Sequence, residues 1–310
     1  MRTGTLQAWR HAGVWLCVSG GAATGLLALG VWPAGATTLS CGSVVTESVT
    51  LTNDLTGCTG DGLDIGADGI TIDLNGHTIS GTGSGLAGVS SGGHSGVTIA
   101  NGTVRGFIAG VTLQGGSDGT VRSVTATGNQ FGIIATGTSD AAITGSTAVK
   151  NGLPGDNGNG ISVVDATNTL VSDDVANGNG FGGINVIGGD GTTVERSVAN
   201  SNHVNGVLVQ GAADTTVTGV TANDNIDNGF FVRSDASNTS IAQSRANATR
   251  EYGGTNGNGM LIQSPSTVLS DTVTNGNQAH GIDAVTGVTA THAIAHGNKA
   301  PADCMNVACS

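Results

Sequence analysis

The chain has 310 residues, of which 54 are glycine, 3% are aromatic and 10% are charged. An average protein has roughly 7% glycine and about 25% charged residues, so this composition argues against an ordinary globular domain with an aromatic core. The 4 prolines, and glycines that do not fall at every third position, exclude collagen, while the 37% apolar content argues against a disordered chain. The abundant glycine, threonine, valine and asparagine instead favour short strands joined by many tight turns.

Residues 1–36 have the features of an export signal. Arg2 and Arg10 stand before an apolar stretch over residues 12–32, which is followed by small residues and contains no acidic side chain. We therefore expect a signal peptide that is cleaved near Ala36, and a secreted protein that is either extracellular or periplasmic. The alternative is a single retained membrane anchor, against which the many glycines of the apolar stretch argue.

Removal of the signal peptide changes the charge of the chain. It leaves 8 basic and 22 acidic side chains, a formal charge of −14, and the basic residues are scattered. Such a surface repels phosphate backbones and anionic lipid headgroups. We therefore expect no nucleic-acid partner and no membrane association after signal cleavage, and we expect a monomer.

Four cysteines remain after residue 36, in two pairs that are close in sequence: Cys41 with Cys58, and Cys304 with Cys309. Because export permits oxidation, we predict one disulfide near each end of the mature chain. Closing the first loop stabilises a fold by roughly 3 kcal/mol in the chain-entropy model. The alternative is four reduced thiols.

A repeat with intervals of 22 to 30 residues runs through most of the chain. Each unit begins with a glycine that precedes aliphatic or aromatic residues, at Gly88, Gly110, Gly132, Gly160, Gly183, Gly206, Gly229, Gly259 and Gly281. Each unit ends in an asparagine, at Asn129, Asn151, Asn179, Asn202, Asn225, Asn247, Asn277 and Asn298. We interpret the asparagines as a ladder of side-chain hydrogen bonds between successive units, and we expect the glycines to supply positive φ angles.

Alternation within a unit predicts how the units assemble. In the strand after Gly206, Val207 and Val209 point to one face, whereas Leu208 and Gln210 point to the other. One such unit cannot bury its apolar face alone, but stacked units form a continuous core. The sequence therefore predicts an all-β fold, a single-stranded parallel β-helix of about nine to ten coils of 22–23 residues. The expected segments are an N-terminal cap, the β-helix and a C-terminal cap, at residues 37–60, 61–298 and 299–310.

These units resemble a known superfamily. The unit at residues 229–247, which begins Gly-Phe-Phe-Val, is similar to the parallel β-helix repeats of the pectate-lyase-like superfamily. The opening stretch at residues 41–77 is similar to the start of many bacterial secreted β-helix proteins of unassigned function. The resemblance covers roughly residues 41–300 and extends to NosD-type periplasmic accessory proteins and secreted polysaccharide-modifying enzymes. It implies a right-handed coil whose substrate lies on the outward face of one parallel sheet, bordered by longer loops.

Two longer units, with extra residues at 152–159 and 248–258, point to such a face. We expect a platform on which sugar rings pack against apolar side chains while Arg233 and glutamines bind hydroxyl groups. The alternative is that the second loop merely covers these apolar residues. The predicted substrate-binding residues are Leu208, Gln210, Phe231, Tyr252, Leu261 and Gln263.

Carboxylates near this platform are candidates for catalysis. Asp224, Asp227 and Glu251 include a possible acid and base pair for glycoside hydrolysis, and Arg233 is a cation that could neutralise a uronate in lyase or epimerase chemistry. The alternative is that the three carboxylates are solvated turn residues, because no catalytic signature of the superfamily matches residue by residue.

Metal chemistry has two sequence signals. His280, His292 and His296 lie in the last unit near Asp283, and the NosD resemblance makes a copper or zinc site worth testing. Aspartates in glycine-rich turns, such as Asp61, resemble calcium-binding solenoids, although the nonapeptide of those proteins is missing. We expect no metal among the site residues and no required cofactor, with calcium possible as a local stabiliser.

Three functions follow from these observations. The first is a secreted protein that binds or modifies an extracellular polysaccharide, as a lyase, hydrolase or epimerase if it is an enzyme. The second is a non-catalytic scaffold that binds a cell-envelope component, and the third is a NosD-like accessory protein.

Overall fold

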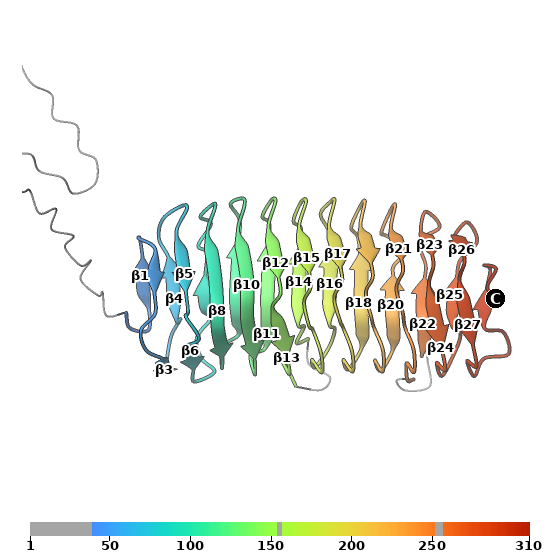
Figure 1. Ribbon diagram of the computed structural model, residues 1–310, viewed down its shortest axis with the longest axis horizontal. Helices are drawn as coiled ribbons and strands as arrows, with labels where there is room; N and C mark the ends of the chain where they lie inside the picture. Colours follow the sequence, from blue (N-terminus) through green and yellow to red (C-terminus); the bar gives the residue numbers. More distant parts are fainter. Residues whose placement is uncertain (1–38, 154–156, 252–256) are drawn as a thin grey trace, which may run out of the picture. The chain divides into compact units, whose positions relative to one another are not determined.

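The computed structural model describes residues 39–153, 157–251 and 257–310, which form a parallel β-solenoid without helices (Figure 1). Each coil contributes one strand to sheet A and, after a turn, one strand to sheet B. The strands of sheet A, in the order in which they pair, are β1 (Ser43–Val45), β4 (Leu63–Ile65), β7 (Ala87–Ser90), β9 (Ala109–Gln114), β11 (Phe131–Thr136), β14 (Ile161–Val164), β16 (Ile184–Ile187), β18 (Asn205–Gln210), β20 (Asn228–Val232), β22 (Asn258–Ile262), β25 (Ile282–Ala284) and β28 (Cys304–Met305).

Sheet B lies opposite, and a third side closes each coil. The main path of sheet B comprises β2 (Val49–Thr50), β5 (Thr71–Asp73), β8 (Thr98–Arg105), β10 (Thr120–Thr127), β12 (Ala142–Thr144), β15 (Leu170–Ser172), β17 (Thr193–Glu195), β19 (Thr216–Thr218), β21 (Ser240–Ala242), β23 (Val268–Ser270) and β26 (Thr289–Thr291). Beside this path lie β3 (Leu55–Cys58), β6 (Thr78–Gly81) and β13 (Thr147–Val149), and β24 (Val273–Asn275) pairs with β27 (Ile294–His296). Single parallel bridges continue the third side between β13 and β24.

The fold confirms the predicted class. Sheet A contains 12 strands within the described residues, which gives about 11 turns, slightly more than the nine to ten predicted. The difference arises at the ends, because β1 pairs in parallel with β4, and β28 pairs with β25. Residues assigned to the caps from sequence therefore add further rungs to the sheets.

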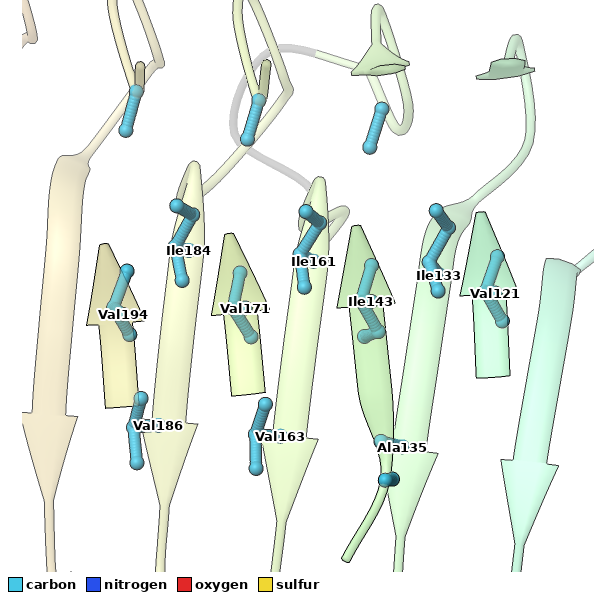
Figure 2. Close-up of a cluster of buried hydrophobic side chains, with 14 of the residues drawn as sticks. Val121, Ile133, Ala135, Ile143, Ile161, Val163, Val171, Ile184, Val186 and Val194 are labelled. Atoms are coloured by element: carbon cyan, nitrogen blue, oxygen red, sulfur yellow. The ribbon is translucent and has the colours of Figure 1, made fainter. Parts of the chain in front are cut away.

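The core is a narrow channel between the sheets, filled by aliphatic columns (Figure 2). Ile133, Ile161 and Ile184 are paired in register on β11, β14 and β16, and each is fully buried. Val171 and Val194 form the facing column on sheet B. Because parallel strands are spaced by about 4.8 Å, each apolar residue rests directly on its equivalent in the next coil. Burial of these columns needs few aromatic residues.

The predicted asparagine ladder lies inside the corner that precedes sheet A. The backbone N–H and the side-chain amide of Asn151 both donate to Oδ1 of Asn179, at 3.0 and 3.1 Å, and the same side chain donates to the Ala126 carbonyl at 3.0 Å. Asn202 and Asn225 repeat this arrangement in later coils. Each asparagine thus satisfies buried backbone groups that the turn would otherwise leave unpaired.

The prediction was wrong at one rung of this ladder. The buried position in that coil belongs to Thr249, whose N–H donates to Oδ1 of Asn277, and not to Asn247. Asn247 belongs to a second, half-buried ladder, in which it accepts from the N–H of Asn275 at 2.7 Å. The two ladders are two residues apart along the chain, so the longer unit around residue 250 allowed the sequence pattern to be assigned to the wrong one.

The expected role of the repeated glycines was also wrong. None of the nine glycines that open the units has a positive φ angle. A Cβ atom on Gly206 would instead lie 2.6 Å from Nδ2 of Asn225 and 2.7 Å from the carbonyl oxygen of Gly229. Glycine is therefore required because the asparagine ladder and the next coil approach the backbone too closely for any side chain.

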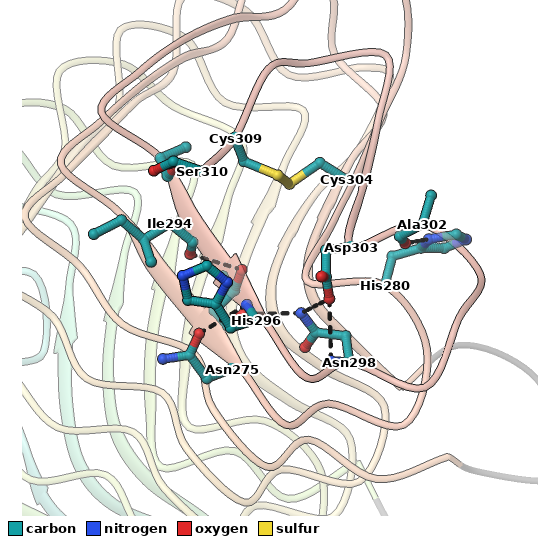
Figure 3. Close-up of a disulfide and its surroundings, with 12 residues drawn as sticks. Asn275, His280, Ile294, His296, Asn298, Ala302, Asp303, Cys304, Cys309 and Ser310 are labelled. Carbon is teal, nitrogen blue, oxygen red and sulfur yellow. Dashed lines mark hydrogen bonds between the residues drawn. A yellow bond between two sulfur atoms is a disulfide. The ribbon is translucent and has the colours of Figure 1, made fainter.

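Both predicted disulfides are present, Cys41–Cys58 and Cys304–Cys309. The second lies beside the last coil, where the backbone of Ser310 pairs with Ala293 (Figure 3). The predicted signal peptide lies outside the described residues. No helix in the described part of the chain is long and apolar enough to span a membrane.

Candidate functional site

A groove of about 430 Å³ lies on the outward face of sheet A, over β11 to β20. Its apolar lining consists of Phe131, Phe181, Ile187, Val204, Leu208 and Phe231. Its amide lining consists of Asn157, Asn159, Asn185, Asn205 and Gln210. Two charged side chains, Asp227 and Arg233, complete the lining that the structure describes. The groove therefore offers rings, amides and one charge of each sign.

Strand register explains how these residues meet. Asn185 on β16, Leu208 on β18 and Phe231 on β20 are direct neighbours in one outward-facing row. A second outward row, two residues further along the strands, pairs Ile187 with Gln210. Because side chains on one face of a strand recur at every second residue, the two rows form the floor of the groove.

Arg233 lies at the end of the second row. Its guanidinium carbon lies 5.9 Å from the centroid of the Phe231 ring, within range of a cation–π interaction. Its backbone N–H donates to the carbonyl of Val209 at 3.0 Å, which continues the pairing of sheet A beyond the end of β20. The side chain remains exposed to solvent. This geometry holds the cation at the edge of the groove, over an aromatic face.

The groove also contains a deeply buried amide without a full set of partners. Asn185 is only 1% exposed, and its Oδ1 has no hydrogen-bond partner. Nearby, Nδ2 of Asn228 donates to Oδ1 of Asn205 at 3.1 Å in a third asparagine ladder. Unlike Asn205, Asn185 has no asparagine above or below it in its row, since Ser162 and Leu208 are its neighbours.

Five of the residues predicted from sequence therefore line one groove: Leu208, Gln210, Phe231, Arg233 and Asp227. Leu261 follows Phe231 in register on β22 but does not line the groove, and Gln263 lies two residues further along the same strand direction. Tyr252 lies outside the described residues. The roles of all these residues in binding remain predictions.

Two of the predicted carboxylates lie elsewhere. Asp224 is exposed at the corner before sheet A, where its carbonyl accepts from Nη2 of Arg250 at 3.2 Å. Glu251 is exposed, and its N–H donates to Oε1 of Gln278 at 3.3 Å. Neither lines the groove, so Asp227 is the one predicted carboxylate in the lining that the structure describes.

The sequence did not point to the other lining residues. Phe131 is the first residue of β11, Phe181 precedes β16, and Asn185 and Ile187 occupy outward positions of β16. The spacing from a repeated glycine could have identified Asn185, because it stands two residues after Gly183, as Leu208 stands two residues after Gly206. The groove extends further toward the N-terminal coils than the platform expected from the loops.

The histidines of the last coil have separate partners, and His280 and His296 point to different partners in Figure 3. Nδ1 of His280 is 2.7 Å from the carbonyl oxygen of Ala302, whereas Nδ1 of His292 is 3.2 Å from Oδ1 of Asp271. The N–H of His296 donates to Oδ1 of Asn275. No group of three or more histidine, cysteine, aspartate or glutamate side chains in the described residues could hold a metal ion. The histidine cluster considered from sequence is therefore not formed.

A second hollow, of about 500 Å³, lies at the corner that precedes sheet A in earlier coils. Phe107, Ile108, Lys150 and Leu153 line it together with several glycines and neighbouring amides. Leu153 is 71% exposed. This hollow lacks the paired rows of outward side chains that floor the groove.

One buried carboxyl group lies apart from the groove, at the corner after β15. Asp174 is 1% exposed, and its Oδ1 accepts from the N–H of Ser146 at 2.6 Å, while Oδ2 has no partner. Burial raises its pKa from 3.8 to about 8. Its neighbour Asp173 is exposed, and the Arg196 guanidinium, which donates to both of its oxygens, lowers its pKa.

The coil direction, the parallel sheets and the stacked aliphatic core define a right-handed parallel β-solenoid. The chain belongs to the right-handed beta helix region family, whose sequence profile matches residues 44–199 and 132–300. A comparison with curated protein sequences finds no match.

Solved structures with this fold include the A-module of the mannuronan C-5 epimerase AlgE4 from Azotobacter vinelandii, which is 14% identical with a TM-score of 0.55. That alignment covers 87% of this chain and 90% of the epimerase module. The catalytic domain of a GH87 alpha-1,3-glucanase is 13% identical with a TM-score of 0.56, over 86% of this chain and 60% of that one. A mutant of the periplasmic alginate epimerase AlgG is 12% identical, with a TM-score of 0.52 over 80% of this chain and 62% of that one. At these identities the similarity shows a common fold alone.

Proposed function

We propose that this protein binds a polysaccharide in the groove on sheet A. The observation that carries the proposal is the combination of three phenylalanine rings with five amide side chains in one groove of about 430 Å³. Sugar rings present apolar faces and hydroxyl edges, so a site for them combines aromatic surfaces with hydrogen-bonding groups. The polysaccharide substrates in the names of the epimerases and the glucanase support the same assignment.

The groove fits a linear chain that lies along the solenoid axis. It extends from Phe131 on β11 to Phe231 on β20. The strand spacing of about 4.8 Å is close to the length of one sugar ring, so each coil can contact one sugar. Between β11 and β20 the groove therefore accommodates a segment of about five sugars, one for each strand.

Modification of the bound chain is the finer part of the proposal. In this proposal Asp227, which lines the groove, acts as an acid or base, and Arg233 stabilises negative charge that develops on the substrate. Hydrolysis needs a second carboxyl group, for which Asp224 and Glu251 remain the predicted candidates. Binding without turnover would instead favour the scaffold that binds a cell-envelope component.

Export is part of the same proposal. Two disulfides are typical of an oxidising compartment, which is where extracellular or periplasmic polysaccharides occur. Calcium as a local stabiliser stays a prediction, which metal analysis of the purified and dialysed protein tests.

The test is binding and turnover on a panel of soluble polysaccharides. Isothermal titration measures binding, while reducing-end and unsaturated-product assays measure hydrolysis and lyase activity. Phe231→Ala removes a ring from the groove and should weaken binding at least tenfold, with little change in the unfolding temperature. Val285→Ala is the matched control, because Val285 is 36% exposed beside β25 and lies outside the groove lining. Binding that survives Phe231→Ala unchanged would contradict the site, and a panel without any binding would contradict the function.

A further inference from the structure

We infer that the groove selects a neutral polysaccharide and discriminates against polyuronates. This inference rests on the proposed function, since it specifies the chemistry of the bound chain. It separates the alternatives raised by the similar folds, whose names include both an alginate epimerase and an alpha-1,3-glucanase. Three features of the groove support it: its charge, the buried amide of Asn185 and the position of Arg233.

The charge of the groove does not match a polyanion. The described lining contains one cation, Arg233, and one carboxylate, Asp227, and its remaining polar groups are neutral amides. A polyuronate carries one negative charge per sugar, so a bound segment would bring about five carboxylates to a lining of zero formal charge. The full chain carries a formal charge of −12, which repels a polyanion before it reaches the groove.

Carboxylates also border the groove. Asp235, which accepts from the N–H of Gly211 at 3.1 Å, follows Arg233 closely in the chain. On the next strand, β25, Asp283 pairs with Leu261 of β22 and so continues the outward row. A long polyuronate that followed this row out of the groove would therefore meet Asp283, whereas a neutral chain would meet no charge repulsion there.

Asn185 supplies the positive part of the argument. Its amide is nine-tenths or more buried, it lines the groove, and its Oδ1 has no partner. An amide oxygen that is buried without a partner costs free energy, which a hydrogen bond from a ligand hydroxyl would recover. The unpartnered Oδ1 is an acceptor, so a hydroxyl, which can donate, satisfies it, whereas a carboxylate, which only accepts, does not.

Arg233 is the one cation in the lining that the structure describes. Its guanidinium carbon lies 5.9 Å from the centroid of the Phe231 ring, at the edge of the groove. One such cation cannot balance successive carboxylates spaced by one coil. The lining is therefore suited to neutral hexoses, with Arg233 at one end of the bound segment.

Matched polymer pairs test the inference. Each pair shares a backbone and differs in carboxyl groups: polygalacturonate with its methyl ester, oxidised with unoxidised cello-oligosaccharides, and glucuronoxylan with xylan. We expect the neutral member of each bound pair to bind at least tenfold more tightly at low salt, and added salt to narrow the difference. Tighter binding of the acidic members would overturn the neutral assignment while leaving polysaccharide binding intact. Absence of binding by every polymer would overturn both the inference and the proposed function.

A charge added to the groove gives a second test. Gln210→Lys places a cation beside Arg233 and should raise the affinity for acidic members relative to neutral ones about tenfold. Thr216→Lys is the matched control, because Thr216 is exposed on β19 of sheet B, away from the groove lining, and the same added charge there should leave the ratio within about twofold. Equal changes in both variants would show that long-range charge, and not the groove, sets the preference, and would overturn the assignment.

Discussion

Inward and outward positions of sheet A alternate along the same strands but repeat very differently. The inward row places isoleucine on isoleucine at Ile133, Ile161 and Ile184, all fully buried. A narrow core permits little else, because each side chain must fill the same space above and below an identical neighbour. Repetition along this row therefore reflects packing.

The outward row in the same coils has no such constraint. It reads Ser162, Asn185, Leu208 and Phe231 on successive strands. At these outward positions the residue type changes from coil to coil while the backbone repeats. Packing therefore does not fix these side chains, and they can form a binding site. The groove lies over this varied row, so departures from the repeat are a better guide to a site than the repeat itself.

The interior departs from its own repeat at Asp174, where the largest effect is expected. Serine occupies this corner in the coils on either side, at Ser146 and Ser197. The unfolded state releases the proton near pH 3.8, while the folded state retains it to about pH 8. The free energy of unfolding should therefore fall as pH rises from about 4 to 8, by up to about 1.4 kcal/mol per pH unit.

Asp174→Asn should abolish this loss, so the variant should match the native chain in stability at pH 4 and exceed it at pH 8. Urea unfolding of both proteins across this pH range measures the free energy of unfolding. The control is Asp173→Asn: its exposed carboxylate has a lowered pKa, so the native ion pair contributes stability that is lost on acidification below its ordinary range. Parallel pH profiles for the native chain and Asp174→Asn would contradict the role of burial.

Phe230 and Phe231 are adjacent in the chain and lie on the inward and outward faces of β20, so their substitution compares the two faces directly. Phe230 is 1% exposed in the core, so Phe230→Ala should cost about 3–5 kcal/mol of stability. Phe231→Ala on the outward face should cost less than about 1 kcal/mol, because its ring remains partly solvated. Chemical denaturation with sugar-binding measurements checks both. Equal destabilisation by the two substitutions would remove the distinction between core and groove.

Gly206→Ala tests why the glycines repeat. The added methyl group must displace the Asn225 side chain or the next coil, at an expected cost of about 1–3 kcal/mol. Gly60→Ala is a suitable control, since its Cβ would have no atom within 4 Å and its φ angle is not positive. That control should be neutral or slightly stabilising. Thermal unfolding of both variants measures these effects. An unfolding temperature unchanged by Gly206→Ala would mean that close approach of neighbouring atoms is not the reason for the glycine.

Thr249→Asn should give the smallest effect. Threonine interrupts the buried asparagine ladder between Asn225 and Asn277, and its Oγ1 has no partner. An asparagine would offer an acceptor to Asn225, with an expected gain of about 1 kcal/mol. A rise in the urea midpoint with an unchanged slope measures this repair. A loss of stability would indicate that the longer unit around residue 250 has no room for the amide.

Sequence periodicity predicted most of the fold, because it records contacts between equivalent residues. The alternation of Val207 and Val209 with Leu208 and Gln210 identified the inward face, and the recurring asparagine identified a ladder. It failed at Asn247, where two ladders run two residues apart and only the burial of Thr249 distinguishes them. Periodicity could find the ladder but not which asparagine lies inside.

The candidate site was predictable in part. Sequence placed Leu208, Phe231 and Arg233 on one outward face, since strand alternation is local. It did not reveal that Phe131 and Phe181, 50 residues apart in the chain, line the same groove as those residues. Which residues line the groove depends on how many coils the groove spans, and the sequence of a single repeat does not contain that information.

By itself, the sequence determined the coil, its inward columns and its two disulfides, because each follows from residues that recur at one interval or are close in the chain. Only the tertiary structure decided the extent of the groove, the exclusion of Asp224 and Glu251 from its lining, and the separation of the last histidines. These depend on the lateral alignment and corner geometry of successive coils. The physical reason is that stacking energy selects a repeating backbone, whereas a site is made by the side chains that stacking leaves unconstrained.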